Sequence, residues 1–230
     1  MKADAINDQA GSLGYIDCQK CKNKGFIAFV RDGNVITREC ECQAKRRTMK
    51  NIAVSGLNDM VCRYTFDTYE TPSAWQKTAK GTALKYMADG KWFCISGTPG
   101  SGKTHLCVAI AGALLNAGRE VSYLLWRDEA PALKALVNDR AEYEKRIERF
   151  KRVDVLYIDD FLKGSVSPAD INLAFEIINA RYNNAKLMTI ISSERTIEEM
   201  LDIDEAVGSR IYERCKGFYI KAPNENWRLR

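Results

Sequence analysis

The feature that most constrains the fold is a glycine-rich segment at residues 97–104, GTPGSGKT. Its G-x-x-x-x-G-K-T spacing is that of a phosphate-binding loop. The glycines let successive backbone N–H groups face phosphate oxygens, and the helix that follows adds the positive end of its dipole. We therefore predict ATP or ADP and Mg²⁺ as cofactors, with Lys103 reaching the β- and γ-phosphates and Thr104 ligating the metal.

The flanking residues provide the context that this motif requires. An apolar run at 92–96 predicts a buried strand before the loop, and apolar residues at helical spacing follow it. A chance match within a glycine-rich loop is the alternative, and this context disfavours it. The residues that we assign to nucleotide binding are Gly97, Thr98, Pro99, Gly100, Ser101, Gly102, Lys103, Thr104 and the adjoining His105.

A second acidic element follows at residues 153–160, VDVLYIDD, an apolar strand that ends in two carboxylates. This is a Walker B pattern, in which Asp159 would hold magnesium and Asp160 would orient or deprotonate the attacking water. Acids at a strand end are often surface caps, so this motif indicates a nucleotide site only in combination with the phosphate-binding loop. Together the two motifs predict an ATPase.

Strands and helices alternate through the rest of the chain, which predicts an α/β fold with a doubly wound parallel sheet and the nucleotide at the carboxyl ends of the strands. The further strands are expected at 121–125, 187–192 and 218–221, and the helices at 79–90, 133–151, 169–182 and 205–215.

Four of the eight cysteines cluster near the N-terminus and predict a structural zinc site. These ligands are Cys18, Cys21, Cys40 and Cys42. A hairpin with strands at 26–30 and 35–38, turning at Asp32-Gly33-Asn34, would bring the two pairs together. Free thiols or two disulfides are the alternatives. A cytosolic chain keeps disulfides reduced, and so short a segment has little core of its own.

Charge and hydropathy bound the remaining possibilities. No run of about 18 apolar residues is present, and acids replace the apolar core of a secretory signal, so we expect a cytoplasmic chain without a membrane partner.

The net charge of +5 is concentrated in residues 1–50, which hold ten Lys and Arg against six Asp and Glu. A solvated basic linker explains that excess. The segment at 139–152 is interpreted as a solvated helix. A nucleic-acid contact through Lys145, Arg149 or Lys163 is the alternative interpretation.

The order and spacing of the motifs resemble the AAA+ helicase loaders of the DnaC/DnaI type, including versions carried by phages of Gram-positive bacteria. The resemblance covers nearly the whole chain. It rests on the four-cysteine module, TFDTY at 65–69, GTPGSGKTH, YIDDFLKG, FEIINARY at 175–182, TIISSE, DEAVGSRIYER and the terminal WRLR.

This resemblance implies a protein of the bacterial cytoplasm that escorts a replicative hexameric DNA helicase onto single-stranded DNA during replication initiation. It also implies self-association through the ATPase domains. The domains would be a zinc-binding module at 1–48 that grips the helicase, a linker with the N-terminal helix of the ATPase at 49–90, and the AAA+ core at 91–230.

The resemblance implies further site residues. Glu194 occupies the sensor-1 position, where many relatives have Asn, and would either contact the γ-phosphate or orient a neighbouring group. Arg210 and Arg214 lie four apart on a predicted helix, and one of them would be the arginine finger offered to the next subunit. Arg228 is similar to the C-terminal sensor arginine.

Only about ten residues follow the last predicted strand, too few for the helical lid of most AAA+ proteins, so a lidless ATPase is expected. Transposition helper ATPases of the IstB type, which act on duplex DNA, share such a core and are the alternative function. The front cysteine module favours the loader. A non-catalytic adaptor that uses nucleotide as a switch is a third possibility, disfavoured by intact Lys103, Asp159 and Asp160.

Overall fold

The computed structural model describes residues 2–89 and 91–229, without the side chains of residues 89 and 228. The chain divides into two compact units, Met1–Val54 and Ser55–Arg230. The three segments expected from the sequence, 1–48, 49–90 and 91–230, stay a prediction. The predicted helix end at Gly90 lies outside the described residues. Within the described ranges, no helix is both long and apolar enough to cross a bilayer.

The first unit is built on a β-hairpin. Its elements are α1 (Lys2–Asp8), β1 (Phe26–Arg31), β2 (Asn34–Glu39) and α2 (Cys42–Ser55), which ends at the boundary with the second unit. The strands are antiparallel, with Arg31 opposite Asn34, so the connection is Asp32 and Gly33 alone. Both connecting residues have positive φ, 51° and 78°, as in a tight two-residue hairpin turn. The predicted hairpin is confirmed, with a turn one residue shorter than expected.

The described residues of the second unit form a five-stranded parallel sheet in the order β4-β5-β6-β3-β7. The strands are β3 (Phe93–Ser96), β4 (Val121–Leu125), β5 (Val155–Asp159), β6 (Met188–Ser193) and β7 (Tyr219–Lys221). Because all are parallel, their carboxyl ends meet at one edge, as predicted. The order places β6 between β3 and β5, so residues at the end of β6 lie beside both nucleotide motifs.

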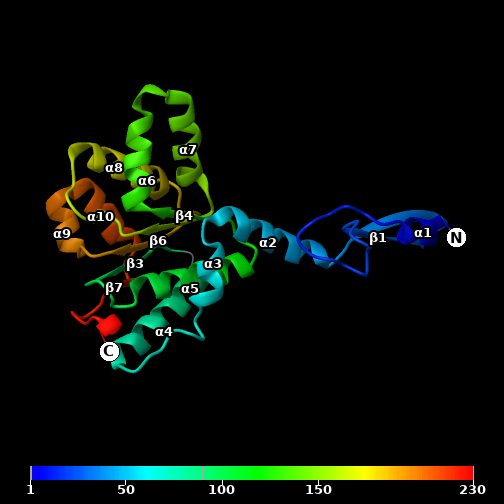
Figure 1. Ribbon diagram of the computed structural model, residues 1–230, viewed down its shortest axis with the longest axis horizontal. Helices are drawn as coiled ribbons and strands as arrows, with labels where there is room; N and C mark the ends of the chain where they lie inside the picture. Colours follow the sequence, from blue (N-terminus) through cyan, green and yellow to red (C-terminus); the bar gives the residue numbers. More distant parts are fainter. Residues whose placement is uncertain (1, 90, 230) are drawn as a thin grey trace. The chain divides into compact units, whose positions relative to one another are not determined.

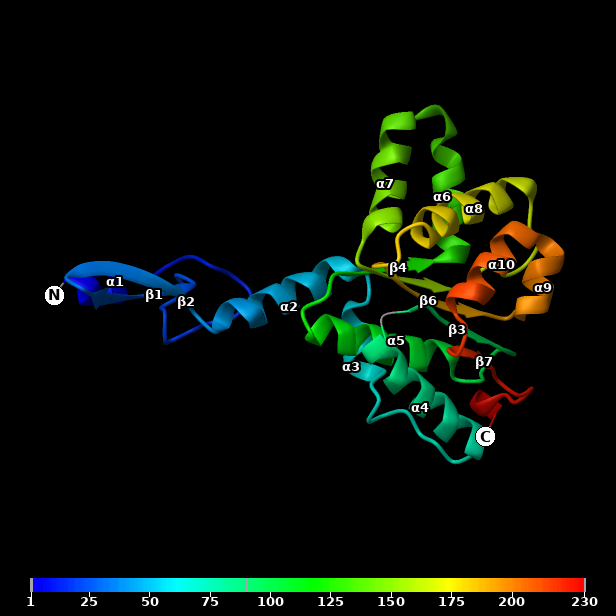
Figure 2. The same ribbon diagram turned by 180° about the vertical axis from the view of Figure 1, so that it is seen from behind.

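Helices cover both faces of this sheet (Figures 1 and 2). On one side lie α3 (Asn58–Arg63), α4 (Ala74–Asp89) and α5 (Lys103–Asn116). On the other lie α6 (Trp126–Ala135), α7 (Arg140–Arg152), α8 (Pro168–Tyr182), α9 (Ile197–Ile203) and α10 (Glu205–Arg214). The three central strands β3, β5 and β6 are buried at every position because helices cover both of their faces. In the described residues after β7, the only helix is the single 3₁₀ turn η2 (Trp227–Leu229).

The continuous helix expected at 133–151 is wrong, whereas the helix expected at 139–152 is confirmed as α7. The chain instead leaves α6, passes through a 3₁₀ turn η1 (Leu136–Asn138) and reverses into α7. The side chain of Asp139 accepts a hydrogen bond from the backbone N–H of Glu142 at 3.1 Å and so caps a new helix. Apolar residues at helical spacing on both sides of the turn concealed this break. The sequence also gave no expectation of α9, which begins with a Thr196–Glu199 capping box.

Arg181 of α8 fixes the helices to the base of the sheet. The side chain is fully buried, and Nη1 donates to the carbonyl oxygens of Phe150 and Val153, both at 2.9 Å. Nη2 donates to the Met188 carbonyl and Nε to the Thr189 hydroxyl. Burial lowers the pKa of Arg181 to about 9, so the group is still cationic at neutral pH. The residue therefore joins the end of α7 to the start of β6.

Replacing Arg181 by methionine is expected to lower the free energy of unfolding by about 3 kcal/mol, because several carbonyls would lose their donor. Urea unfolding followed by tryptophan fluorescence reports on the second unit, where all four tryptophans lie. The matched control is Arg140→Met, whose exposed side chain pairs with Glu144 and should not change stability. Equal unfolding midpoints for the two variants would contradict this role.

Candidate functional site

The glycine-rich loop joins the end of β3 to the start of α5 and contacts the C-terminal segment. Gly100 has φ of +79°, and a Cβ built there would stand 2.0 Å from Oδ1 of Asn226. The backbone N–H of Trp227 donates to the Gly100 carbonyl at 3.0 Å. Gly102, at the N-terminus of α5, has φ of +87°. Glycine is required at these positions by a left-handed backbone and, at Gly100, by close packing.

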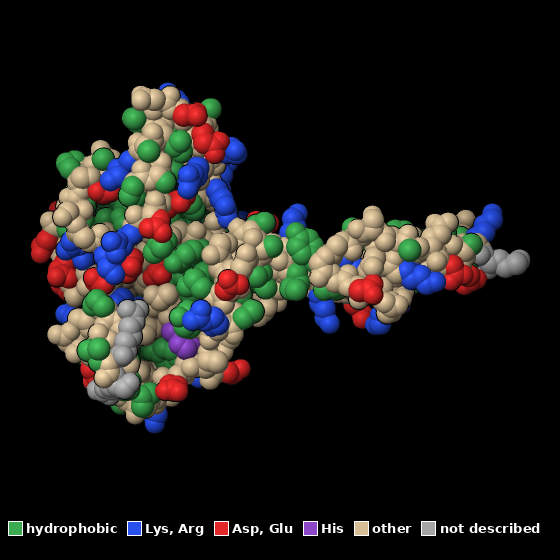
Figure 3. All heavy atoms as spheres, in the orientation of Figure 1, with side chains coloured by type: hydrophobic (Ala, Val, Ile, Leu, Met, Phe, Trp, Pro, Cys, Tyr) green, Lys and Arg blue, Asp and Glu red, His purple; other side chains and the backbone are tan. Residues whose placement is uncertain are grey.

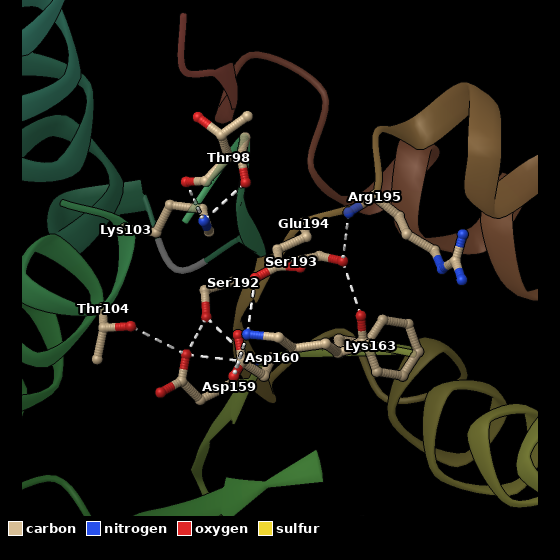
Figure 4. A network of polar contacts seen from close by, with 12 residues as sticks. Thr98, Lys103, Thr104, Asp159, Asp160, Lys163, Ser192, Ser193, Glu194 and Arg195 are labelled. Atoms are coloured by element: carbon tan, nitrogen blue, oxygen red, sulfur yellow. Dashed lines mark hydrogen bonds and ion pairs between the residues drawn. The ribbon is translucent and has the colours of Figure 1, made fainter. Parts of the chain in front are cut away.

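Lys103 lies inside the curl of this loop. Its Nζ donates to the carbonyl oxygens of Gly97 at 2.7 Å and Thr98 at 2.8 Å (Figure 4). Burial lowers the pKa of Lys103, while the nearby carboxylates of Glu194 and Asp160 oppose that shift. The side-chain nitrogen of Lys103 is therefore held by carbonyl oxygens of the loop, in the segment where such loops bind phosphates.

Asp159, at the end of β5, is the point where three other elements meet. Its carboxylate accepts hydrogen bonds from the hydroxyls of Thr104 at 3.3 Å, Tyr123 at 3.0 Å and Ser192. Burial, and next the Asp159 charge, raise the pKa of Tyr123. The structure thus brings together Thr104 and Asp159, the two residues expected to bind magnesium. Sequence analysis missed Tyr123 and Ser192 because only the strand order places β4 and β6 on either side of β5.

The neighbouring Asp160 has φ of +53° and pairs with a lysine. Lys163 Nζ lies 3.1 Å from Oδ2 of Asp160 and 2.6 Å from Oε1 of Glu194. Figure 4 shows the lysine between the two acids, while the Arg195 side chain points away from them. The two acids predicted from different motifs are therefore joined through one cation.

These residues line a cleft of about 290 Å³. Its lining comprises Tyr64, Pro99, Gly100, Gly102, Lys103, Thr104, His105, Asp160, Lys163, Glu194 and Trp227. In the described part of the chain, the loop hydroxyls of Thr98 and Ser101 are buried without a hydrogen-bond partner. Loop amides, unpaired hydroxyls and lysines suit a polyphosphate, and the adjoining carboxylates suit its magnesium ion. The residues present therefore fit a magnesium nucleotide.

His105 connects the phosphate loop to the TFDTY segment. Its ring centroid lies 5.0 Å from that of Tyr64 and 5.1 Å from that of Tyr69. Its Nε2 lies 3.1 Å from the Thr65 carbonyl oxygen and 3.2 Å from the Thr68 hydroxyl. Burial lowers the pKa of the imidazole. His105 lines the cleft, and these contacts also make it an anchor for residues 64–69.

The two candidate finger arginines lie over aromatic rings of their own chain. The Arg210 guanidinium stands 5.1 Å from the ring centroid of Phe175 and 5.4 Å from that of Tyr182. The Arg214 guanidinium stands 5.7 Å from a ring centroid of Trp92. Neither of them lines the cleft described above. The side chain of Arg228, the candidate sensor, lies outside the described residues.

The four predicted zinc ligands form a compact sulfur cluster in the first unit, with all Sγ atoms within 4.8 Å of one another. The Sγ atoms of Cys18 and Cys40 are 3.9 Å apart, and those of Cys21 and Cys42 are 3.6 Å apart. A disulfide would require about 2.05 Å. Four thiolates around a tetrahedral Zn²⁺ with Zn–S bonds of about 2.3 Å stand about 3.8 Å apart. The spacing therefore fits a bound metal ion.

The four sulfurs lie close enough to shift the pKa values of one another. Burial raises the pKa of Cys21, but the backbone N–H of Gly25, 3.3 Å from its Sγ, and the neighbouring sulfurs lower it to about 6. The Cys42 amide lowers the pKa of Cys40, yet burial and the neighbouring sulfurs raise it to about 11. Four thiolates this close repel one another unless a cation lies among them.

Comparisons with known proteins agree with the geometry. A family model described as IstB-like ATP binding protein matches residues 17–230. The phage-like element PBSX protein XkdC of Bacillus subtilis is 32% identical over 89% of this chain and 81% of its own length. The replicative helicase loader DnaC of Escherichia coli K12 is 27% identical over 79% of this chain and 73% of its own. These matches confirm the predicted class, a P-loop ATPase.

A solved structure supports the fold. The crystal structure of the DnaC helicase loader superposes with a TM-score of 0.59 and 23% sequence identity. The superposition covers 70% of this chain and 97% of that one. At this identity the likeness concerns the fold, and it confirms the predicted α/β architecture with a parallel sheet.

Gly100→Ala is expected to weaken ATP binding at least about tenfold, because its Cβ would displace either the loop or Asn226 and misalign the loop amides. Isothermal titration with ATP measures the effect. Gly118→Ala is the matched control, since Gly118 also has positive φ, +84°, but nothing lies within 4 Å of its added Cβ. Wild-type affinity in Gly100→Ala would contradict the tight fit of this loop.

Proposed function

The chain belongs to the family of IstB-like ATP-binding proteins, and we propose that it is an ATP-dependent loader of a replicative hexameric DNA helicase. It would act in the bacterial cytoplasm and help to place the helicase on single-stranded DNA during replication initiation. The observation that supports this best is the pairing of an AAA+ ATPase unit with a separate four-cysteine unit.

In the ATPase unit, the loop residues 97–104 and Lys103 would bind the phosphates of ATP or ADP. Thr104 and Asp159 would hold the magnesium ion, which neutralises charge developing on the phosphates. Asp160 would orient the attacking water. The support for these roles is the hydrogen bond between Thr104 and Asp159 and the presence of Lys103 and Asp160 in one cleft.

In the first unit, the four cysteines would hold one Zn²⁺ in a structural role, because four protein ligands leave no open position. This unit would grip the helicase. Its surface offers apolar side chains for a protein partner, with Tyr15 56% exposed and Val30 57% exposed.

Self-association through the ATPase units would place Arg210 or Arg214 at the nucleotide of a neighbouring subunit. Their position outside the cleft of their own chain agrees with a role in trans. Direct contact with single-stranded DNA has weaker support. Basic and acidic side chains are mixed on the face shown in Figure 3, and Lys145 pairs with Glu142 at 3.0 Å.

The alternative function is that of an IstB-like transposition helper acting on duplex DNA. The description of the matching family model is the observation that favours it. The two functions share the ATPase site, so they are separated by the partner and not by nucleotide chemistry.

The deciding experiment is co-purification of the full chain and of residues 55–230 with candidate hexameric helicases and, separately, with a transposase and duplex DNA. A loader should form a stable complex with a helicase through the first unit, and residues 55–230 alone should not. A complex with the transposase and duplex DNA, without any helicase complex, would instead establish the alternative.

The purified chain should contain about one zinc ion, because the four sulfurs form one tetrahedral site. Metal analysis with a colorimetric chelator after thiol oxidation measures the content. Cys21→Ser should lose the metal, whereas Cys62→Ser should keep it, since Cys62 is an exposed cysteine of the second unit. A folded wild-type protein without metal would disprove the zinc assignment.

A further inference from the structure

The sensor position at the end of β6 presents an electrostatic problem. Glu194 there is an acid, and it lines the same cleft as Lys103 and Asp160. A carboxylate beside a triphosphate repels it, and Asp159 and Asp160 already add negative charge at this edge of the sheet. The site therefore needs a further cation close to Glu194.

Lys163 is placed to be that cation. Its Nζ contacts Glu194 at 2.6 Å and Asp160 at 3.1 Å, and all three side chains are about one-quarter exposed. Burial lowers the pKa of Lys163, but the hydrogen bonds to Glu194 and Asp160 outweigh it and raise the pKa, so the group is charged at neutral pH. Among the described residues that line the cleft, the ammonium groups belong to Lys103 and Lys163.

The backbone around Lys163 is fixed by hydrogen bonds and not by the ion pair alone. Asp160 and Leu162 both have φ of 53°, and the Lys163 N–H donates to the Asp160 carbonyl at 3.1 Å. From the segment that follows β6, Arg195 donates to the carbonyls of Leu162 at 2.8 Å and Gly164 at 2.7 Å. This tight turn directs the lysine back toward the cleft (Figure 4).

We propose that Lys163 contacts the γ-phosphate of ATP and that Glu194 is a positioning residue that holds it there. An ammonium has three N–H donors. Two of them are directed at Glu194 and Asp160, and the third remains for a phosphate oxygen. The Lys163–Glu194 ion pair thus recognises the γ-phosphate. Without Lys163, this recognition would need a neutral side chain at the position of Glu194. This inference rests on the proposed ATP site.

The test compares affinities for ADP and for a non-hydrolysable ATP analogue, each with magnesium, by isothermal titration of the full chain. Lys163→Met should weaken binding of the ATP analogue at least about tenfold and leave ADP within about twofold, because only the γ-phosphate loses a contact. Lys163→Arg should keep most of the preference for ATP. Unchanged ADP affinity also shows that the variant is folded.

The role of Glu194 is tested in the same assay. Glu194→Gln in the Lys163→Met background should recover part of the lost affinity for the ATP analogue, because the uncompensated carboxylate is removed. Lys151→Met is the matched control, since Lys151 also bridges two acids, Glu148 at 2.7 Å and Glu176 at 3.3 Å, and is similarly exposed. It should leave both affinities unchanged.

Two results would overturn the inference. Equal losses for ADP and the ATP analogue in Lys163→Met would show a merely structural role. Unchanged affinity for both would show that no γ-phosphate contact exists. A wild-type chain that binds neither nucleotide would instead disprove the proposed ATP site, so the two failures are distinguishable.

Discussion

The ATPase unit depends on one buried carboxylate, that of Asp159. It is 5% exposed and lies at the end of β5, yet its hydrogen bonds reach α5 through Thr104, β4 through Tyr123 and β6 through Ser192. A buried charge is costly unless donors surround it. These hydroxyls meet that need, and in doing so they fix the edge of the sheet beside the loop. The contacts that stabilise the fold therefore also hold the Thr104 hydroxyl beside the Asp159 carboxylate.

The other charged side chains at this edge of the sheet are arranged so that acids and lysines lie beside one another. Asp159, Asp160 and Glu194 stand close together, and Lys103 and Lys163 lie among them. Lys103 is held by loop carbonyls, whereas Lys163 is held by the acids themselves. The two lysines therefore differ in what they can do. Lys103 belongs to the loop, and Lys163 joins Asp160 to Glu194.

The first unit is stabilised differently. Its buried cluster consists of Cys21, Cys40 and Cys42, with Ile16, Cys18 and Ile27 packed around it, so sulfur replaces the aliphatic core of a larger domain. A unit of this size buries too little apolar surface to be stable by that means alone. A metal ion in the cluster would supply the missing free energy, and the unit would then be a rigid platform for a partner.

The sequence alone determined the phosphate loop, the hairpin and the four-cysteine set, because each depends on residues close together in the chain and on glycine or cysteine chemistry. It also determined the parallel α/β class through the alternation of strands and helices. Only the tertiary structure decided the contacts of Tyr123 and Ser192 with Asp159, and the pairing of Lys163 with Glu194. These depend on which strands become neighbours, and the strand order is set by the packing of the whole unit.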